Sequence, residues 1–207
     1  MFKNYLKIAF RNIKRHKGYS FINIAGLAIG MACCILMVVY ISSELSFDRY
    51  HENADRIYRL CHHANIGGTD DISGVSNAVA APALRDSFPE VVNAVRFGWT
   101  FQPVVKYQDK QFFESGFYYA DDSVFDIFSW PMIKGNPGTA LKAPYSIVLT
   151  EDMAKKYFAD EEPLGKILKL DNKDNYTVTG VIKNIPVNSH FLFNGLLSFK
   201  TLYARGK

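Results

Sequence analysis

The sequence predicts an α+β extracytoplasmic domain on a single N-terminal transmembrane helix, with an amphipathic interfacial helix before the span. Three observations support this fold class. Residues 18–43 contain no charged side chain, and the first 17 residues carry six basic and no acidic side chains. The part beyond the uncharged stretch mixes short strand-like and short helical patterns. We therefore expect one folded unit, anchored at its N-terminus.

The first 17 residues predict a short amphipathic helix at the cytoplasmic surface of the membrane. Apolar residues recur there at near-helical spacing between the basic ones, which is typical of a helix lying in the membrane interface. Basic side chains suit anionic lipid headgroups, so we expect Lys14, Arg15 and Lys17 to contact membrane lipids. This helix is interpreted as a topology anchor, and a lever linked to a cytoplasmic partner is the alternative.

The apolar run from Tyr19 to Ile41 predicts the membrane helix. Roughly 20 apolar residues are enough to span the ~30 Å hydrocarbon core of a bilayer. A cleaved secretory signal is the alternative, but its apolar region is usually only about 7 to 15 residues long. Basic residues precede the run and the first acidic residue, Glu44, follows it. The positive-inside bias therefore predicts a cytoplasmic N-terminus and a translocated remainder.

One face of the predicted span carries small and polar residues. Gly26 and Gly30 form a GxxxG pair, which lets helix backbones approach closely in lipid, and Asn23 is placed to hydrogen-bond across such a contact. These three residues are the candidates for helix packing. Ordinary span composition is the alternative interpretation of the same pattern.

Beyond the span, the sequence predicts a β-α-β beginning. Residues 56–61 and 91–97 are strand-like, and residues 80–88 are helical up to Pro89, which cannot continue a helix. The later elements have clearer turn signals. They are several short strands in 102–120, a helix at 122–128 capped by Asp121 or Asp122, a loop at 135–138, a strand at 146–149, a helix capped by Thr150 that runs through about Tyr157, strands at 166–170, 176–182 and 193–199, and a fraying tail.

The sequence contains no pattern that predicts catalysis. It has no phosphate-binding G-x-x-x-x-G-K-[ST], no G-x-S-x-G and no H-E-x-x-H, and we expect no cofactor, no metal and no catalytic residue. Residues 18–207 carry 18 basic and 20 acidic side chains, 18 − 20 = −2, so nucleic acid is not an expected partner. One group of His and carboxylate residues is expected to lie at the surface: His51, His62, His63, Asp70 and Asp71. One run of aromatic residues is expected to pack in the core: Phe112, Phe113, Phe117, Tyr118, Tyr119, Phe125, Phe128 and Trp130.

Motifs spread over nearly the whole chain resemble those of MacB-type ABC transporter permeases, also called FtsX-like permeases. They occur in the same order as in that family. The matching stretches are residues 6–13 (LKIAFRNI), 44–48 (ELSFD), 53–59 (NADRIYR), 88–91 (FPEV), 135–137 (GNP) with 140–141 (AL), 146–151 (SIVLTE), 157–158 (YF), 163–166 (PLGK), 178–181 (VTGV) and 189–191 (SHF).

This resemblance implies a permease subunit, or the N-terminal part of one, in a bacterial inner membrane. In such a transporter a separate ABC ATPase closes on ATP, and two permease subunits transmit the motion to their outer domains for export or extraction of a substrate. The resemblance also implies the domain division: a cytoplasmic helix at 1–17, a transmembrane helix at 18–43, the opening of a porter-like lobe at 44–100 and an inserted second lobe at 101–207.

A single-pass, membrane-anchored sensor or binding module is the alternative function from another class, because one span and one outer domain would suffice for it. An anchored hydrolase is disfavoured, since the sequence offers no nucleophile beside a base. An ATPase partner and further membrane spans would distinguish a permease from a sensor.

Overall fold

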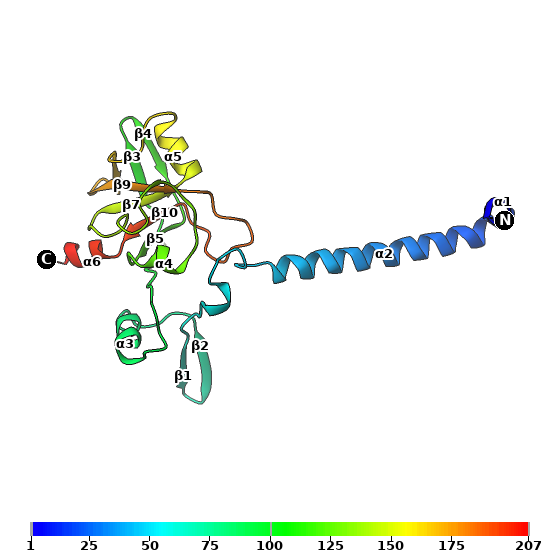
Figure 1. Ribbon diagram of the computed structural model, residues 1–207, viewed down its shortest axis with the longest axis horizontal. Helices are drawn as coiled ribbons and strands as arrows, with labels where there is room; N and C mark the ends of the chain where they lie inside the picture. Colours follow the sequence, from blue (N-terminus) through cyan, green and yellow to red (C-terminus); the bar gives the residue numbers. More distant parts are fainter. Residues whose placement is uncertain (1, 100, 207) are drawn as a thin grey trace. The chain divides into compact units, whose positions relative to one another are not determined.

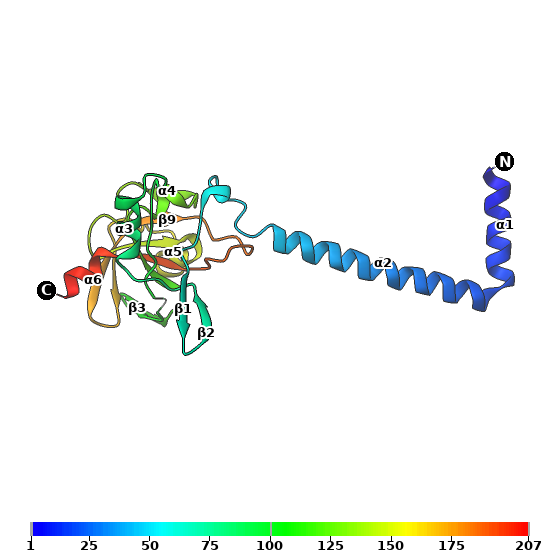
Figure 2. The same ribbon diagram turned by 90° about the horizontal axis from the view of Figure 1, so that it is seen from below.

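The computed structural model describes residues 2–99 and 101–206 and divides into two compact units, one up to Phe47 and one from Asp48 on (Figure 1). The first unit consists of two helices joined at His16, which Figure 2 shows clearly. They are α1, Phe2–Arg15, and α2, Lys17–Leu45.

Helix α2 is the one helix among the described residues that is long and apolar enough to cross a membrane. Its 29 residues correspond to ~43 Å at ~1.5 Å per residue, more than the hydrocarbon core needs. None of its residues is buried against the rest of the described chain. An apolar helix that finds no cover in its own chain fits a membrane protein.

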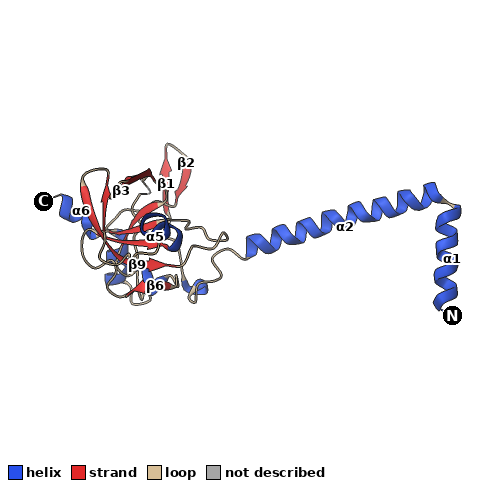
Figure 3. Ribbon diagram, turned by 90° about the horizontal axis from the view of Figure 1, so that it is seen from above, coloured by secondary structure: helices blue, strands red, loops and turns tan. Residues whose placement is uncertain are grey.

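The second unit is a mixed α+β domain, as expected, built on an 8-stranded sheet (Figure 3). The strand order is β4-β3-β8-β9-β7-β10-β5, and β6 also pairs with β9. The β7–β9 and β10–β5 pairs are parallel and the others antiparallel. The strands are β3 Val104–Tyr107, β4 Lys110–Phe113, β5 Phe117–Ala120, β6 Met132–Gly135, β7 Ser146–Thr150, β8 Ile167–Leu170, β9 Asp174–Ile182 and β10 Gly195–Ser198.

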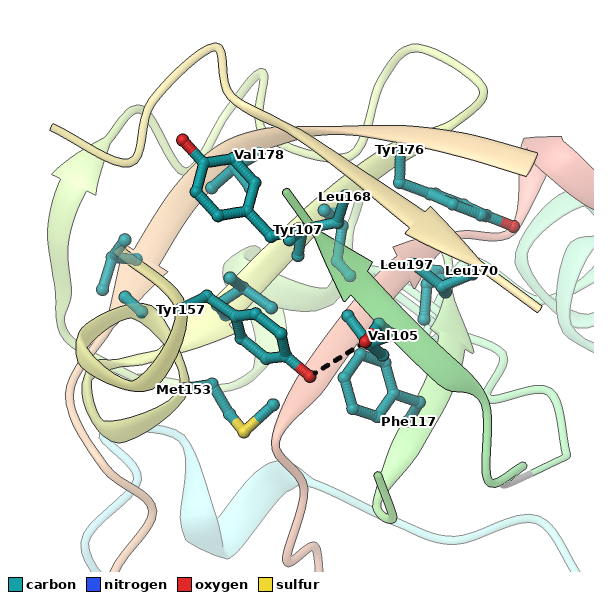
Figure 4. Close-up of a cluster of buried hydrophobic side chains, with 14 of the residues drawn as sticks. Val105, Tyr107, Phe117, Met153, Tyr157, Leu168, Leu170, Tyr176, Val178 and Leu197 are labelled. Atoms are coloured by element: carbon teal, nitrogen blue, oxygen red, sulfur yellow. Dashed lines mark hydrogen bonds between the residues drawn. The ribbon is translucent and has the colours of Figure 1, made fainter. Parts of the chain in front are cut away.

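Side-chain patterning explains the place of the strands. Every residue of β7, with the sequence SIVLT, is buried, as expected for a strand covered on both faces, whereas β8 alternates between exposed and buried residues. Figure 4 shows side chains of the core around Tyr157, from α5, Glu151–Phe158, against Val105 and Phe117. The Tyr157 hydroxyl donates to Glu114 Oε1 at 2.7 Å, so this buried polar group is satisfied.

Two glycines allow close approaches that a side chain would block. Gly135 ends β6 at φ +94°, and a Cβ there would lie 2.4 Å from the carbonyl oxygen of Thr179. Gly195 begins β10, where a Cβ would lie 2.7 Å from the ring of Phe117 on the neighbouring strand. Both positions therefore exclude larger residues.

The predicted β-α-β opening is wrong in its strands. Its helix exists as α3, Ala80–Ser87, but a 3-10 turn at Ala54–Arg56 precedes an unpaired segment where the first strand was expected. Within the described residues, segment 91–97 makes a single β-bridge, between Phe97 and Ala120. The strands of this region form instead an unpredicted hairpin, whose two-residue turn is Gly67-Gly68 at positive φ. Its strands are β1, His62–Ile66, and β2, Thr69–Ser73.

Other local expectations need correction. Ser123 precedes α4, Val124–Ile127, without a side-chain cap, and the Asp121 carboxylate binds Arg96 instead. Thr150 does precede α5, but its hydroxyl donates to Asn194 O at 3.5 Å and caps no helix N–H. Helix α6, Lys200–Arg205, replaces the expected fraying tail, and strand β6 was missed.

Candidate functional site

The basic residues predicted to contact lipid lie at the junction of α1 and α2. Lys14 and Arg15 end α1, where positive charge also interacts favourably with the helix dipole, and Lys17 begins α2. All three are exposed, and the Lys14 ammonium lies 5.7 Å from the centre of the Phe10 ring. Their contact with headgroups, and the interfacial position of α1, stay predictions.

The small-residue face of α2 is open. A Cβ added to Gly26 or Gly30 would meet nothing within 4 Å, so no contact inside the described chain requires either glycine. Leu27, Met31, Cys34 and Ile35 flank the two glycines along a shallow groove on this face of the helix. Asn23 lies one turn before Gly26 and is also exposed. Packing of another helix into this groove stays a prediction.

The predicted His/carboxylate cluster separates in the structure. His63 Nε2 lies 3.4 Å from Asp70 Oδ1 across the exposed β1–β2 hairpin. His51, in contrast, is 4% exposed, so its predicted place on the surface is wrong. Within residues 2–99 and 101–206, no three His, Cys, Asp or Glu side chains gather as a metal site would require.

The segment directly after α2 is held by two loops of the sheet domain. We call this arrangement the clasp: residues 48–52 with Ser129 and Trp130 on one side and residues 188–190 on the other. Asp48 N–H donates to Asn188 O at 3.0 Å, and Glu52 N–H donates to Ser129 Oγ at 3.0 Å. Residues 48–52, at the start of the sheet domain, therefore contact segments that lie more than 70 residues further along the chain.

A relay of hydrogen bonds runs through the clasp and ends on a carboxylate. Trp130 Nε1–H donates to Tyr50 Oη at 2.9 Å, and Tyr50 donates to Ser189 Oγ at 2.9 Å. Ser189 in turn donates to Asp48 Oδ1 at 3.0 Å, and His190 Nδ1 lies 2.6 Å from Asp48 Oδ2. Asp48 has φ +55°, a conformation that Asp tolerates better than most residues. Each donor is matched, so the network holds these segments in one arrangement.

The His51 side chain packs on the other side of the clasp. Its Nδ1 accepts the Ser129 N–H at 3.1 Å, which places the ring proton on Nε2, and Nε2 has no hydrogen-bond partner among the described residues. The ring lies against Tyr50, with centroids 4.1 Å apart, and edge-on to Phe128 and Trp130. A protonated ring could not accept the Ser129 N–H, so this contact requires neutral histidine.

Two groups of the clasp have shifted acidities. Burial lowers the pKa of His51, and the negative charge of Asp48 offsets this only in part. Burial by itself would raise the pKa of Asp48, but hydrogen bonds from His190 and Ser189 outweigh it and lower that pKa. Both folded pKa values lie below their unfolded values, so both groups stabilise the fold at high pH and lose this contribution as pH falls.

We expect the chain to lose stability in two acid steps. Below about pH 6.5, the pKa of histidine in an unfolded chain, protonation of His51 in the unfolded state favours unfolding. Below about pH 4, protonation of Asp48 in the unfolded state has the same effect. Thermal unfolding measured from pH 8 to pH 3 should show both steps. His51→Asn, whose amide oxygen can still accept the Ser129 N–H, should flatten the upper step alone, and Asp48→Asn the lower. A pH profile that neither variant changes would contradict the assignment.

A second connection ties segment 77–98 to the sheet. Arg96 binds Asp121 in bidentate fashion, with Nη2–Oδ1 at 2.7 Å and Nε–Oδ2 at 2.8 Å. Its Nη1 also donates to Ala78 O and to the Tyr203 hydroxyl, and its guanidinium lies 4.3 Å from the centre of the Phe199 ring. Arg96 therefore joins three segments that are distant in sequence.

Sequence reasoning missed the clasp. It used residues 189–191 and 44–48 only as family motifs. The available signal was that SHF and ELSFD, both family motifs, contain the polar residues that meet here: Asp48, Ser189 and His190. Nothing in their spacing, more than 140 residues, showed that they pair.

Comparisons with known proteins agree with this architecture. The sequence profile of the MacB-like periplasmic core domain matches residues 20–206. A solved domain of a candidate permease from Porphyromonas gingivalis is similar in fold, with 22% identity and a TM-score of 0.57, over 69% of this chain and 63% of that one. No curated protein matches the chain.

Two further solved structures are more distant. The periplasmic region of MacB from Actinobacillus actinomycetemcomitans has 22% identity and a TM-score of 0.48, over 60% of this chain and 56% of that one. The extracellular domain of the ABC-type transporter YknZ from Gram-positive bacteria has 19% identity and a TM-score of 0.43, over 55% and 58%. The chain thus covers less than two thirds of each solved relative named here.

Proposed function

The chain belongs to the family of MacB-like periplasmic core domains, and on this premise we propose that it acts as a permease subunit of an ABC transporter, or as the N-terminal part of one. A separate ABC ATPase would hydrolyse ATP, and the chain would carry the resulting motion to an extracytoplasmic domain that exports or extracts a substrate. It would act mechanically and not as an enzyme.

The clasp is the observation that carries this proposal. A mechanical role requires that the outer domain firmly holds the segment with which it begins. Residues 48–52, which begin this domain, are bonded through backbone and side chains to two of its loops. A flexible tether, which would suffice for a simple anchor, needs no such network.

The remaining parts of the chain have matching roles in this proposal. The N-terminus would lie in the cytoplasm of a bacterial inner membrane, with Lys14, Arg15 and Lys17 at the headgroups. The groove at Gly26 and Gly30 would receive another helix, from a second permease subunit or from further spans of the permease, with Asn23 available for an interhelical hydrogen bond. The porter-like lobe and inserted lobe would divide near residue 100.

Co-purification tests the function. Two differently tagged copies of the full-length protein, produced together in the native host, should recover each other and an ATPase with a phosphate-binding loop. Gly26→Leu should lower recovery of the second copy or of the ATPase about tenfold, since helix contact in lipid depends on close backbone approach. Ala28→Leu, on the opposite side of α2, is the matched control and should have little effect.

Three results would count against the permease. Recovery of the protein without ATP turnover and without a nucleotide-binding partner would favour the membrane-anchored sensor. Equal losses for Gly26→Leu and Ala28→Leu would remove the proposed contact face. A tag that follows residue 207 and reports from the cytoplasm would contradict the orientation.

A further inference from the structure

The clasp consists of two halves that differ in chemistry. In what we call the Ser129 half, His51 Nδ1 accepts the Ser129 N–H at 3.1 Å, and the Glu52 N–H donates to Ser129 Oγ at 3.0 Å. In the Asp48 half, the N–H and the carboxylate of Asp48 bond to residues 188–190. The first half needs an imidazole nitrogen that accepts a hydrogen bond, whereas the second needs a carboxylate.

A protonated His51 ring does not fit the closed Ser129 half. The side chain is 4% exposed, and its Nε2–H already lacks a hydrogen-bond partner among the described residues. A second proton on Nδ1 would face the Ser129 N–H, so two buried donors of the ring would be unsatisfied. The rings of Phe128 and Trp130 attract a cation, but they supply no lone pair for either N–H group. Protonation therefore favours a state in which the ring reaches water.

Asp48 does not supply the missing acceptor. Its negative charge raises the pKa of His51, but burial lowers that pKa by more. Ser189 donates to Asp48 Oδ1, and His190 contacts both carboxylate oxygens through its N–H and its ring. Asp48 would have to leave these partners before it could bind a protonated His51.

The other ionisable side chains next to His51 make no hydrogen bond to its ring either. Those on its own segment are Arg49, Tyr50 and Glu52, and residues 128–130, which pack against the ring, carry none. Arg49 and Glu52 are exposed, and the Tyr50 hydroxyl donates to Ser189. Within the described residues, no carboxylate therefore bonds to the His51 ring in the closed clasp.

We propose that the Ser129 half is an acid-sensitive switch, which opens in mild acid while the sheet and the Asp48 half stay in place. On protonation, His51 and Glu52 leave Ser129 and the imidazolium reaches water. The Asp48 half stays closed because a protonated His190 would bind the Asp48 carboxylate more strongly, not less. One end of the segment is thus released without unfolding of the outer domain.

The sign of the pH response follows from burial. His51 has a lower pKa in the closed clasp than in water, so the open form takes up the proton more readily. Below about pH 6.5, the ordinary pKa of histidine, each further pH unit should raise the opening constant by up to about tenfold, until the closed form is protonated too. The pKa of Asp48 is lowered, so this carboxylate stays ionised over the same range.

Residue-resolved hydrogen exchange of the full chain in lipid nanodiscs tests the switch. The Glu52 and Ser129 amides report its opening, whereas the Asp48 amide and those of β7 report the other half of the clasp and the sheet. From pH 7.5 to pH 5.5, after correction for intrinsic exchange, the opening constant of the first two amides should rise about five- to tenfold. At pH 5.5 they should exchange at least about tenfold faster than the other amides, with little dependence on low concentrations of urea.

Two substitutions identify the group that takes up the proton. His51→Asn keeps an oxygen that can accept the Ser129 N–H but takes up no proton, so its opening constants should agree within about twofold at the two pH values. His190→Asn is the matched control, because it removes the other histidine of the clasp and should leave the response unchanged. The comparison of amides within the unsubstituted chain stands even if a variant does not fold.

Three results would overturn the switch. The Glu52 and Ser129 amides would exchange together with those of β7 if the clasp opened only by global unfolding. Their opening constant would not rise at pH 5.5 if the closed clasp accepted the proton. A rise that survives His51→Asn would assign the response to another group. None of these measurements involves an ATPase, so the permease function is tested separately.

Discussion

Arg96→Met should lower the free energy of unfolding of the outer domain by about 3 kcal/mol, at the low end of the cost of breaking a buried ion pair. The side chains of Arg96 and Asp121 are 20% and 18% exposed, so removing the cation leaves a mostly buried carboxylate without its bidentate partner. The contacts with Ala78, Tyr203 and Phe199 are lost at the same time.

Thermal or urea unfolding of the full chain in detergent measures this effect, with an expected fall in Tm of roughly 10 °C for a domain of this size. Lys200→Met is the control, because it breaks the more exposed Lys200–Asp122 ion pair and should cost less than about 1 kcal/mol. The double substitution Arg96→Met with Asp121→Leu should recover part of the loss, since no carboxylate then stays unpaired. A loss for Arg96→Met no larger than for Lys200→Met would contradict the role assigned to Arg96.

Trp130→Ala should cost about 3 to 5 kcal/mol, the range for deleting a large buried aromatic side chain. Trp130 is buried, stacks on Phe128 at 4.7 Å between ring centres, meets Phe193 edge-on at 4.8 Å and donates to Tyr50. The substitution therefore opens a cavity beside the clasp and removes the first donor of its relay.

Hydrogen exchange should show where this loss acts. The Glu52 and Ser129 amides, which both take part in the clasp, should lose protection through local opening. Amides in β7 should exchange only when the whole domain unfolds, so their protection should fall only as far as the global stability falls. Trp130→Phe preserves an aromatic ring against Phe128 and should cost less than half as much. Full protection at Glu52 in a folded Trp130→Ala protein would show that Trp130 does not support the clasp.

The sequence by itself determined the features that depend on local patterns. The uncharged run 18–43 predicts α2 because the length of an apolar helix must match the membrane. The strands β3, β4, β5, β7, β8 and β9 follow from alternation and turn residues, and α5 from its periodicity after Thr150. The family was also recognisable, since its motifs lie in order along the chain and the family profile matches residues 20–206.

The tertiary structure alone decided which extended segments pair. Segments 56–61 and 91–97 have strand-like composition but belong to no ladder in the part of the chain that the structure describes, because a strand exists only where a partner completes its hydrogen bonds. The hairpin β1–β2 formed where the composition was more polar, because Gly67-Gly68 closes the turn and supplies the partner directly.

The contacts of the clasp and the exposure of β4 were likewise decided by the tertiary structure. Asp48 and His190 are 142 residues apart, and the buried ring of His51 packs against Phe128 and Trp130, which are more than 70 residues away in sequence. Phe112 and Phe113 look like core residues in sequence, yet β4 lies at the end of the strand order, which leaves them exposed. The hydrophobic pattern of a segment predicts which of its side chains would be buried, but long-range packing decides whether a neighbouring element covers them.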